Sequence, residues 1–490
     1  MTIIGIDFGT TNSSCAVYKD GKLDMIPDDG NASCLIPSII SFDQNGEVII
    51  GKEVSESLCN RDDLHNVIYD IKRLIARSFN DTELEIDGKR WPFHLIDKDN
   101  EPQIYIQFGD EMLLVSPSQA VSYVLKRLKE NAEKYLNETV TEVVIGLPVA
   151  LDQGREIKQR KTMMEAAEIA GLKIVDFITE PNAAAMAYSH YLQSNIKQIL
   201  VYDFGGGTLD ISIIRYDTKE NITVLSVSGD PHLGGNDFDA RLVSHFMDQY
   251  DRENEPRKFP RTEHSVVQRL YRECRRVKEA LSTSDREIKL QLSHVNGNKP
   301  LINRLTRDIF NKLCVEQIDG TIIWVDHALE KVNMTANDID QVLLAGGSSR
   351  IPRVRKILED KFGREKVLNS SKFIPEHAIA LGAAIRAHDL EKITNTTPVR
   401  ADLNDANNAS AIKEKVEITP NSSETTANQP STSIQNKKTE PELVLVPGPS
   451  KQEQPSKADV IYTTFKNLVV SEKKLIEVIA DTVDDMIESD

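Results

Sequence analysis

Short apolar runs alternate with amphipathic stretches along residues 1–390. The runs at residues 143–147 and 342–345 have the length and composition of buried strands. Residues 118–137 and 265–281 carry apolar positions at helical spacing and predict helices. Strands that alternate with helices are typical of an α/β fold. We therefore expect an α/β domain over residues 1–390.

This pattern ends near Thr394, where the composition changes. From there to about Lys457, Asn, Ser, Thr, Pro, Gln and Lys dominate, without a periodic apolar face. Such a stretch buries too little apolar surface to offset its chain entropy, so residues 391–457 are predicted to be a disordered linker. Residues 458–490 regain an apolar stripe at helical spacing and predict an amphipathic helix. We expect this helix to dock on its own domain, on another copy or on an unknown protein partner.

One local motif occurs twice. Residues 4–12 (IGIDFGTTN) and 200–210 (LVYDFGGGTLD) each contain an apolar strand, an Asp and a Gly/Thr turn, and a second strand follows. Backbone N–H groups exposed at such a turn form a nest for phosphate oxygens, and Thr hydroxyls add donors. The Asp of each copy, Asp7 and Asp203, is suited to hold a hydrated Mg²⁺ through its waters. Two copies predict two similar half-domains that grip one polyphosphate.

Composition and charge narrow the range of partners. Lys+Arg 59 against Asp+Glu 76 gives a formal net charge of -17, which argues against non-specific binding to nucleic acid or to a membrane surface. The five cysteines are scattered without a CxxC pair, so we expect reduced, mostly buried thiols. We find no signal peptide and no apolar run long enough to span a bilayer, and we expect a cytoplasmic location.

Taken together, the motifs resemble the nucleotide-binding domain of the seventy-kilodalton heat-shock (DnaK-type) chaperones, over residues 2–390. Besides the two phosphate loops, the motifs that carry the resemblance are residues 71–75 (IKRLI, expected to begin a helix), 144–148 (VIGLP), 178–185 (ITEPNAAA), 232–239 (HLGGNDFD), 346–350 (GGSSR) and 378–384 (AIALGAA). The resemblance implies an actin-like ATPase with two lobes, built on duplicated ribonuclease H-like subdomains around a central nucleotide cleft. It also implies ATP or ADP with Mg²⁺, and K⁺ as a further candidate ion. The candidate protein partners are a J-domain co-chaperone and a nucleotide-exchange factor.

The chemistry of the motifs and the resemblance together assign candidate site residues. Lys72 resembles the family lysine that places a cation beside the γ-phosphate, and Glu180 resembles the carboxylate that positions water. With them, the expected catalytic set is Asp7, Lys72, Glu180, Asp203 and Thr208. The expected phosphate-binding set is Gly9, Thr10, Thr11, Asn12, Gly205, Gly206, Gly207, Gly234 and Gly235. The expected adenosine-binding set is Lys278, Ser282, Gly346, Gly347, Ser348, Arg350 and Glu376.

The chain departs from the family pattern at the adenosine end and after Leu390. Arg275 stands where the family usually has Glu, Glu279 where Arg is frequent, and Glu376 where Asp is usual. After Leu390 there is no succession of short strands that would predict the family's peptide-binding β-sandwich. Peptide clamping is therefore not carried over by the resemblance.

Three functions fit these features. The first is a slow, co-chaperone-stimulated ATPase of the heat-shock type, whose nucleotide state changes lobe closure and partner binding. The second is a non-catalytic ATP-sensing scaffold that recruits a partner through its C-terminal helix. The third is a filament-forming actin-like protein. The presence of Asp7, Lys72, Glu180, Asp203 and Thr208 favours the first.

Overall fold

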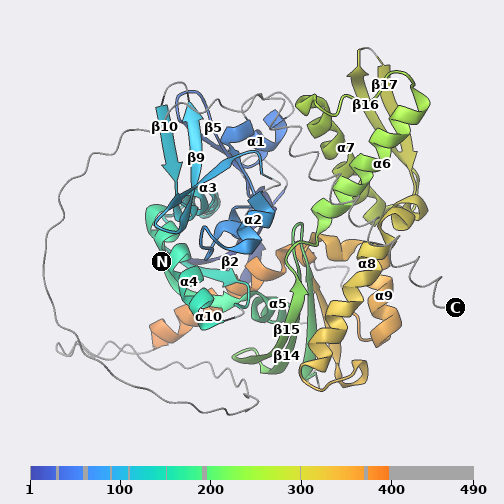
Figure 1. Cartoon of the computed structure of the whole chain (residues 1–490). Coiled ribbons are helices and arrows are strands. Elements are labelled where there is room, and N and C mark those ends of the chain that lie inside the picture. Colours follow the sequence, from blue (N-terminus) through green and yellow to red (C-terminus); the bar gives the residue numbers. More distant parts are fainter. Residues whose placement is uncertain are drawn as a thin grey trace, which may run out of the picture. The chain divides into compact units, whose positions relative to one another are not determined.

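The computed structural model describes most of the chain up to Thr396. The described residues are 2–28, 33–58, 64–88, 91–108, 111–150, 152–189, 196–297, 299–368 and 374–396. Residues 397–490, which include most of the predicted linker and the whole predicted C-terminal helix, lie outside them. The described part is a mixed α/β structure, as expected from the sequence (Figure 1).

The first large sheet is built around the strand that precedes the first Gly/Thr turn. Its order is β12-β11-β1-β2-β3, with β4 paired to β2. The central strand β1 pairs antiparallel with β2 and parallel with β11. The bounds are β1 Ile3–Phe8, β2 Asn12–Lys19, β3 Lys22–Met25, β4 Ile36–Pro37, β11 Glu142–Leu147 and β12 Lys173–Thr179.

A second sheet repeats this arrangement around the second Gly/Thr turn. Its order is β15-β14-β13-β18, and β13 pairs antiparallel with β14 and parallel with β18. In this register Asp203 lies opposite Asp210, as Asp7 lies opposite Ser14 in the first sheet. The bounds are β13 Gln198–Phe204, β14 Leu209–Thr218, β15 Asn221–Asp230 and β18 Gln341–Ala345. The duplicated motif is thus accompanied by duplicated strand pairing.

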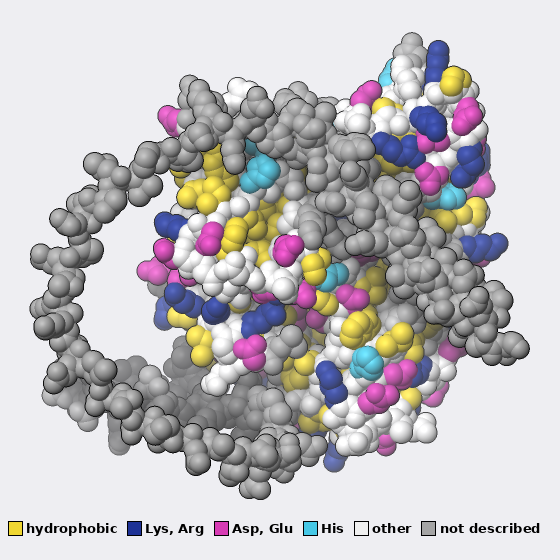
Figure 2. All heavy atoms as spheres, viewed as in Figure 1, with side chains coloured by type: hydrophobic (Ala, Val, Ile, Leu, Met, Phe, Trp, Pro, Cys, Tyr) yellow, Lys and Arg dark blue, Asp and Glu magenta, His cyan; other side chains and the backbone are white. Residues whose placement is uncertain are grey.

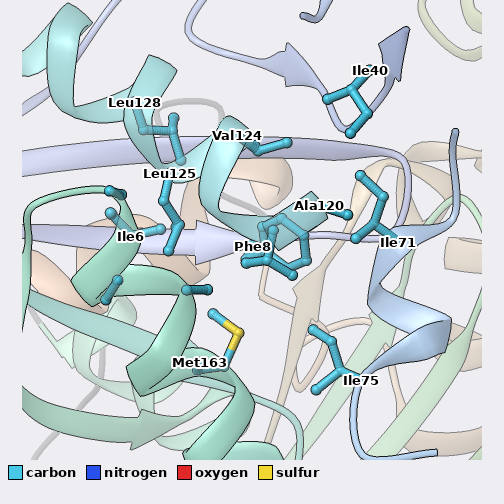
Figure 3. Packing of buried hydrophobic residues seen from close by; sticks show 14 of the residues in the cluster. Ile6, Phe8, Ile40, Ile71, Ile75, Ala120, Val124, Leu125, Leu128 and Met163 are labelled. Atoms are coloured by element: carbon cyan, nitrogen blue, oxygen red, sulfur yellow. The ribbon is translucent and has the colours of Figure 1, made fainter. Parts of the chain in front are cut away.

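Side-chain alternation along β1 separates the core from the site. Ile4, Ile6 and Phe8 point into one hydrophobic core, where Figure 3 shows Ile6 and Phe8 among side chains of α3 (Pro117–Leu136) and α4 (Gln153–Ile169). Because successive strand residues face opposite sides, Asp7 points away from this core. Burial of Phe8 at the strand end therefore holds the following turn and Asp7 in place.

The opposite faces of both central strands pack on two helices. Ile3 of β1 and Val201 of β13 belong to one core together with residues of α5 (Glu180–Tyr188) and α10 (Ala378–Thr396). Alanines in both helices and Gly382 in α10 permit close approach: a Cβ added at Gly382 would lie 1.9 Å from the carbonyl oxygen of Ala183. Glu180 begins α5 and is carried by this tightly packed helix pair.

Gly382→Ala is expected to destabilise the protein by about 1–3 kcal/mol, because the new methyl group would overlap the backbone of α5. Gly320→Ala is the matched control. Gly320 lies in the α8 helix (Arg307–Glu330) with no heavy atom within 4 Å of the new Cβ, so helix propensity should stabilise that variant by about 0.5–1 kcal/mol. Urea unfolding of the two variants measures both changes, and a Gly382→Ala variant as stable as Gly320→Ala would contradict the packing described.

The remaining elements surround these two sheets. In Figure 1, β16 and β17 lie with α6 and α7, whereas α8 lies along β14 and β15. The remaining strands are β5 Ile40–Phe42, β6 Val48–Ile50, β7 Val67–Ile68, β8 His94–Lys98, β9 Glu101–Phe108, β10 Glu111–Val115, β16 Ile288–Asn296 and β17 Lys299–Leu305. The remaining helices are α1 Lys52–Ser57, α2 Thr82–Gly88, α6 Gly235–Glu253, α7 His264–Thr283, α9 Pro352–Phe362 and the short 3₁₀ helices η2 Leu64–Asn66, η3 Ile71–Leu74, η5 Ala336–Asp338, η6 Gly347–Arg350 and η7 Pro375–His377.

Several local predictions can be compared with these elements. The helices expected at 118–137 and 265–281 are present as α3 and α7, and the strands at 143–147 and 342–345 as β11 and β18. The helix expected to begin at Ile71 is instead the four-residue 3₁₀ turn η3, which follows Asp70 in the left-handed conformation. Among the described cysteines, three are buried, Cys34 is half-buried, and all four are free thiols.

The surface gives little further indication of a partner. On the face shown in Figure 2, side chains of both charges are interspersed with hydrophobic ones, which is the pattern of an ordinary hydrated surface. Over the part of the chain that the structure describes, no helix has the length and apolar character needed to cross a membrane.

Candidate functional site

The two repeated Gly/Thr turns lie against each other. A Cβ added at Gly206 would lie 2.1 Å from Thr11 Oγ1, and one added at Gly207 would lie 3.0 Å from Thr10 Cγ2. The hydroxyl of Thr11 is buried and has no hydrogen-bond partner among the described residues. Backbone and hydroxyl donors from both sheets are therefore brought to one place, as a polyphosphate ligand would require.

Local hydrogen bonds hold each turn. In the first, Ser38 Oγ donates to the Gly9 carbonyl (2.8 Å) and the Ser38 N–H donates to the Thr11 carbonyl (2.9 Å). In the second, the Gly205 N–H donates to the Thr208 carbonyl (3.0 Å) and closes the hairpin. Asn12 begins β2 directly after the first turn and is exposed. Hydrogen bonds within the chain therefore hold the conformation of both turns.

The second turn also contacts the start of α6. A Cβ added at Gly234 would lie 2.4 Å from the backbone of Gly206 and Gly207, and the Gly235 N–H donates to the Gly205 carbonyl (3.1 Å). Only glycine permits this approach of two backbones. The structure thus places Gly234 and Gly235 beside Gly205, Gly206 and Gly207 of the second turn.

A buried ion pair lies beside the two turns. Lys72 Nζ is 2.5 Å from Glu180 Oε1, and the two side chains are only 19% and 8% exposed. Lys72 comes from η3, in the part of the chain that carries the first sheet, and Glu180 is the first residue of α5. Consecutive Lys and Arg residues are usually solvated on an exposed helix. Lys72 instead lies in a short 3₁₀ helix with its ammonium against Glu180.

Three aspartates surround this pair. Burial raises the pKa of Asp7 to about 7, with Lys72 opposing and Glu180 adding to the shift. Burial also raises the pKa of Asp210 to about 6, and the pKa of Asp203 lies well above its usual value because of burial and the neighbouring carboxylates. Burial alone would lower the pKa of Lys72, but Glu180, Asp7 and Asp210 raise it above its usual range.

The cluster therefore has four carboxyl groups against the ammonium of Lys72: Glu180 is buried, Asp7 and Asp203 are half-buried, and Asp210 is exposed. A hard divalent cation such as Mg²⁺ would relieve this excess of negative charge, because oxygen is its preferred donor. Among the described residues, no three His, Cys, Asp or Glu side chains are arranged to ligate a metal directly. The donor set thus fits a Mg²⁺ that keeps several of its waters, with Asp7 and Asp203 as outer partners.

The loop after β18 joins the second turn to the predicted adenosine end. Gly346 has φ of 70°, and a Cβ there would lie 2.6 Å from Asp203 Oδ1. Ser348 Oγ donates to the Gly205 carbonyl (2.7 Å), which ties η6 to the second turn. Arg350 Nη1 is 3.2 Å from Glu376 Oε1, and a Cβ added at Gly347 would lie 3.4 Å from the Glu376 side chain.

The helix α7 contributes the rest of the predicted adenosine set. Lys278 Nζ donates to the Gly235 carbonyl (2.7 Å) and pairs with Asp239 (2.9 Å). Ser282 lies one turn further along, and its hydroxyl donates to the Lys278 carbonyl (3.3 Å). The structure therefore places Lys278 against α6, with Ser282 connected to the site through the backbone of α7.

Two of the unusual residues on α7 acquire partners within the fold. Arg275 Nε is 3.2 Å from Asp239 Oδ2, and Arg275 Nη2 donates to Asn236 Oδ1 (3.0 Å), so this guanidinium is tied to α6. Burial raises the pKa of Glu279; Lys278 and Arg275 oppose the shift, and Asp239 and Glu376 add to it.

Two residues of the cluster received no role from the sequence. Asp210 ends the second repeated motif and lies opposite Asp203 on the neighbouring strand. Arg73 follows Lys72 in η3, and its Nη2 donates to the Gly207 carbonyl (2.8 Å) of the second Gly/Thr turn. The equivalent position in the first sheet is Ser14, so the repeat gave no signal for Asp210, and nothing in local spacing indicated the contact of Arg73.

A duplicated sheet whose Gly/Thr turns meet beside a buried Lys–Glu pair is the arrangement expected of an actin-like ATPase. A family model described as Hsp70 protein matches residues 3–444, which is most of the chain. The chain therefore belongs to the Hsp70 family, whose members are ATP-dependent chaperones with ATPase activity that bind ATP or ADP together with Mg²⁺. The matched region includes residues 397–444, outside the described part.

Proposed function

We propose that this protein binds and slowly hydrolyses ATP between two lobes, each built on one of the two sheets as a ribonuclease H-like subdomain. The observation that carries the proposal is the meeting of the two repeated turns beside Lys72 and Glu180. The turns supply backbone and hydroxyl donors for the β- and γ-phosphates. The loop at Gly346–Arg350, with Lys278, Ser282 and Glu376, receives the adenosine.

The charged cluster supplies the groups that phosphoryl transfer to water requires. Lys72 places a fixed positive charge beside the γ-phosphate and stabilises charge that develops in the transition state. Glu180 orients the attacking water and holds the ammonium of Lys72 (2.5 Å). Mg²⁺, when bound, neutralises phosphate charge. Asp7 and Asp203 hold its waters, and Thr208 donates to the phosphates.

The same proposal extends to regulation. Bound nucleotide draws the lobes together, and the resulting change of shape alters partner binding. The partners we propose are a J-domain co-chaperone that stimulates hydrolysis, a nucleotide-exchange factor that promotes release, and an unknown protein that binds residues 458–490. The charge balance and the free cysteines support a cytoplasmic setting.

ATP turnover by the purified chain, measured with and without a J-domain protein, tests this function. Stimulated turnover supports a heat-shock-type ATPase. Tight ATP binding without turnover would indicate the ATP-sensing scaffold instead. ATP-dependent sedimentation of the chain would indicate a filament-forming protein.

Asp203→Asn is expected to weaken Mg²⁺-dependent ATP binding by about tenfold to a hundredfold, because the variant loses a charged partner of the metal's waters. ADP binding without metal should change much less. Calorimetry with and without Mg²⁺ measures the two affinities, with Asp217→Asn, an exposed position of β14 in the same sheet, as the control. Equal losses under both conditions would mean that Asp203 supports the structure of the turn rather than the metal.

A further inference from the structure

A second charged cluster links the parts of the chain that carry the two sheets. It consists of Arg73 on η3, Glu83 and Asp87 on α2, and His232 in the segment that follows β15; we call it the Arg73–His232 clasp. His232 Nε2 is 2.6 Å from Glu83 Oε2, and His232 Nδ1 is 3.3 Å from Arg73 Nη1 and 3.2 Å from Asp87 Oδ1.

One arrangement of protons satisfies the imidazole. With the proton on Nε2, His232 donates to Glu83, and its Nδ1 accepts from the Arg73 guanidinium. Arg73 Nη1 also donates to Asp87 Oδ1 (3.3 Å). A charged group lies at each end of this chain of hydrogen bonds, which makes the bonds stronger than neutral ones.

Burial makes the clasp sensitive to loss of a member. The side chains of Arg73 and Asp87 are 9% and 2% exposed, and Asp87 Oδ2 has no hydrogen-bond partner among the described residues. Removing a partner from such a buried group leaves that group without a hydrogen bond. The resulting loss of folding free energy is larger than the loss caused by removing one partner of an exposed pair. The segment of His232 is itself held, because the His232 N–H donates to Asp230 Oδ1 (2.8 Å).

The clasp also reaches the phosphate turns. Arg73 donates to the Pro231 carbonyl (2.6 Å) and the Gly207 carbonyl (2.8 Å), so one guanidinium holds both the segment before Gly234 and the second Gly/Thr turn. Arg73 is also the neighbour of Lys72 in η3. Any movement that separates the two turns must therefore break the contacts of Arg73 and His232.

We propose that the Arg73–His232 clasp is a positioning device that holds the second phosphate turn against the first and sets the rate at which nucleotide leaves. The proposal rests on the proposed function, because it describes regulation of that same site. Arg73 and His232 are positioning residues, because the contacts that place them are to α2 and to loop carbonyls. Glu83 is the outermost member, since its side chain is 36% exposed, and offers the mildest way to loosen the clasp.

Release of a fluorescent ADP analogue, followed by stopped flow, tests the proposal in the full chain. Glu83→Gln and His232→Ala should each accelerate release about tenfold, the scale of one charge-assisted hydrogen bond. The double variant should be little faster than His232→Ala, because both substitutions break the same contact. Glu85→Gln, an exposed position of the same helix with the same change of charge, is the control and should leave release unchanged.

A ligand-free measurement separates the clasp from nucleotide binding. Urea unfolding of the wild type, both single variants and the double variant gives a double-mutant cycle, in which non-additive effects are expected for Glu83 and His232. Unchanged release rates, or rates that multiply independently in the double variant, would overturn the proposal. If the wild type bound no nucleotide, the proposed function would fail; non-additive unfolding would then support the clasp as a contact between the sheets, and additive unfolding would overturn it.

Discussion

Lys72→Ala is expected to reduce the rate of ATP hydrolysis by about a hundredfold or more, the usual effect of losing one group that stabilises transition-state charge. ATP binding should be affected much less, because the turns at Gly9–Asn12 and Gly205–Thr208 are held by their own hydrogen bonds. The measurement is a single-turnover assay at saturating ATP, which separates the chemical step from binding and product release.

The control is the Lys126→Ala variant, which replaces an exposed lysine of α3. This variant should hydrolyse ATP at the wild-type rate. Because Lys72 is the buried partner of Glu180, its loss also leaves a carboxylate without its cation. Unfolding of the variant must therefore be measured in parallel. A folded Lys72→Ala protein with an unchanged single-turnover rate would refute the role assigned to Lys72.

Asp7→Asn is expected to stabilise the ligand-free protein at pH 8 by about 2–4 kcal/mol while abolishing its function. Burial raises the pKa of Asp7 to about 7, far above the value of about 4 expected in the unfolded chain. The folded state therefore holds this proton more tightly, and stability is lost as pH rises from about 4 to about 7. Asparagine has no charge to bury and removes this loss.

The difference in the free energy of unfolding between the Asp7→Asn variant and the wild type should thus be largest at pH 8 and should shrink toward pH 4. Denaturant unfolding of both proteins across this range, without nucleotide or metal, measures it. An Asp7→Asn variant that is less stable than the wild type at pH 8, or a difference between the two proteins that does not change with pH, would contradict the electrostatic description of Asp7.

Much of the fold and most of the candidate site could be predicted from the sequence, because their signals are local. Apolar runs and helical spacing indicated β11, β18, α3 and α7, and each is present. The repeated strand–Asp–Gly/Thr motif located both phosphate turns, since backbone nests form from neighbouring residues. The motif also implied a duplicated arrangement, which is present in the strand pairing around β1 and β13.

The tertiary structure decided which of these residues meet. Asp7, Glu180 and Asp203 lie far apart in the chain and come together because α5 and α10 pack between β1 and β13. The raised pKa values of Asp7 and Asp203 follow from desolvation where these groups meet, which no local spacing encodes. The same holds for Arg275, whose charge is matched by Asp239 on another helix.

The contacts of Arg73 and His232 are the clearest example of this division. Arg73 lies in the motif at residues 71–75 and His232 in the motif at residues 232–239, and the sequence alone assigned a role to neither residue. Their contact depends on the relative positions of η3, α2 and the end of β15. The end of β15 is far from η3 and α2 in the sequence and belongs to a different part of the fold. Local sequence therefore determined the two Gly/Thr turns, whereas long-range packing determined the charges that surround them and the contacts that hold them together.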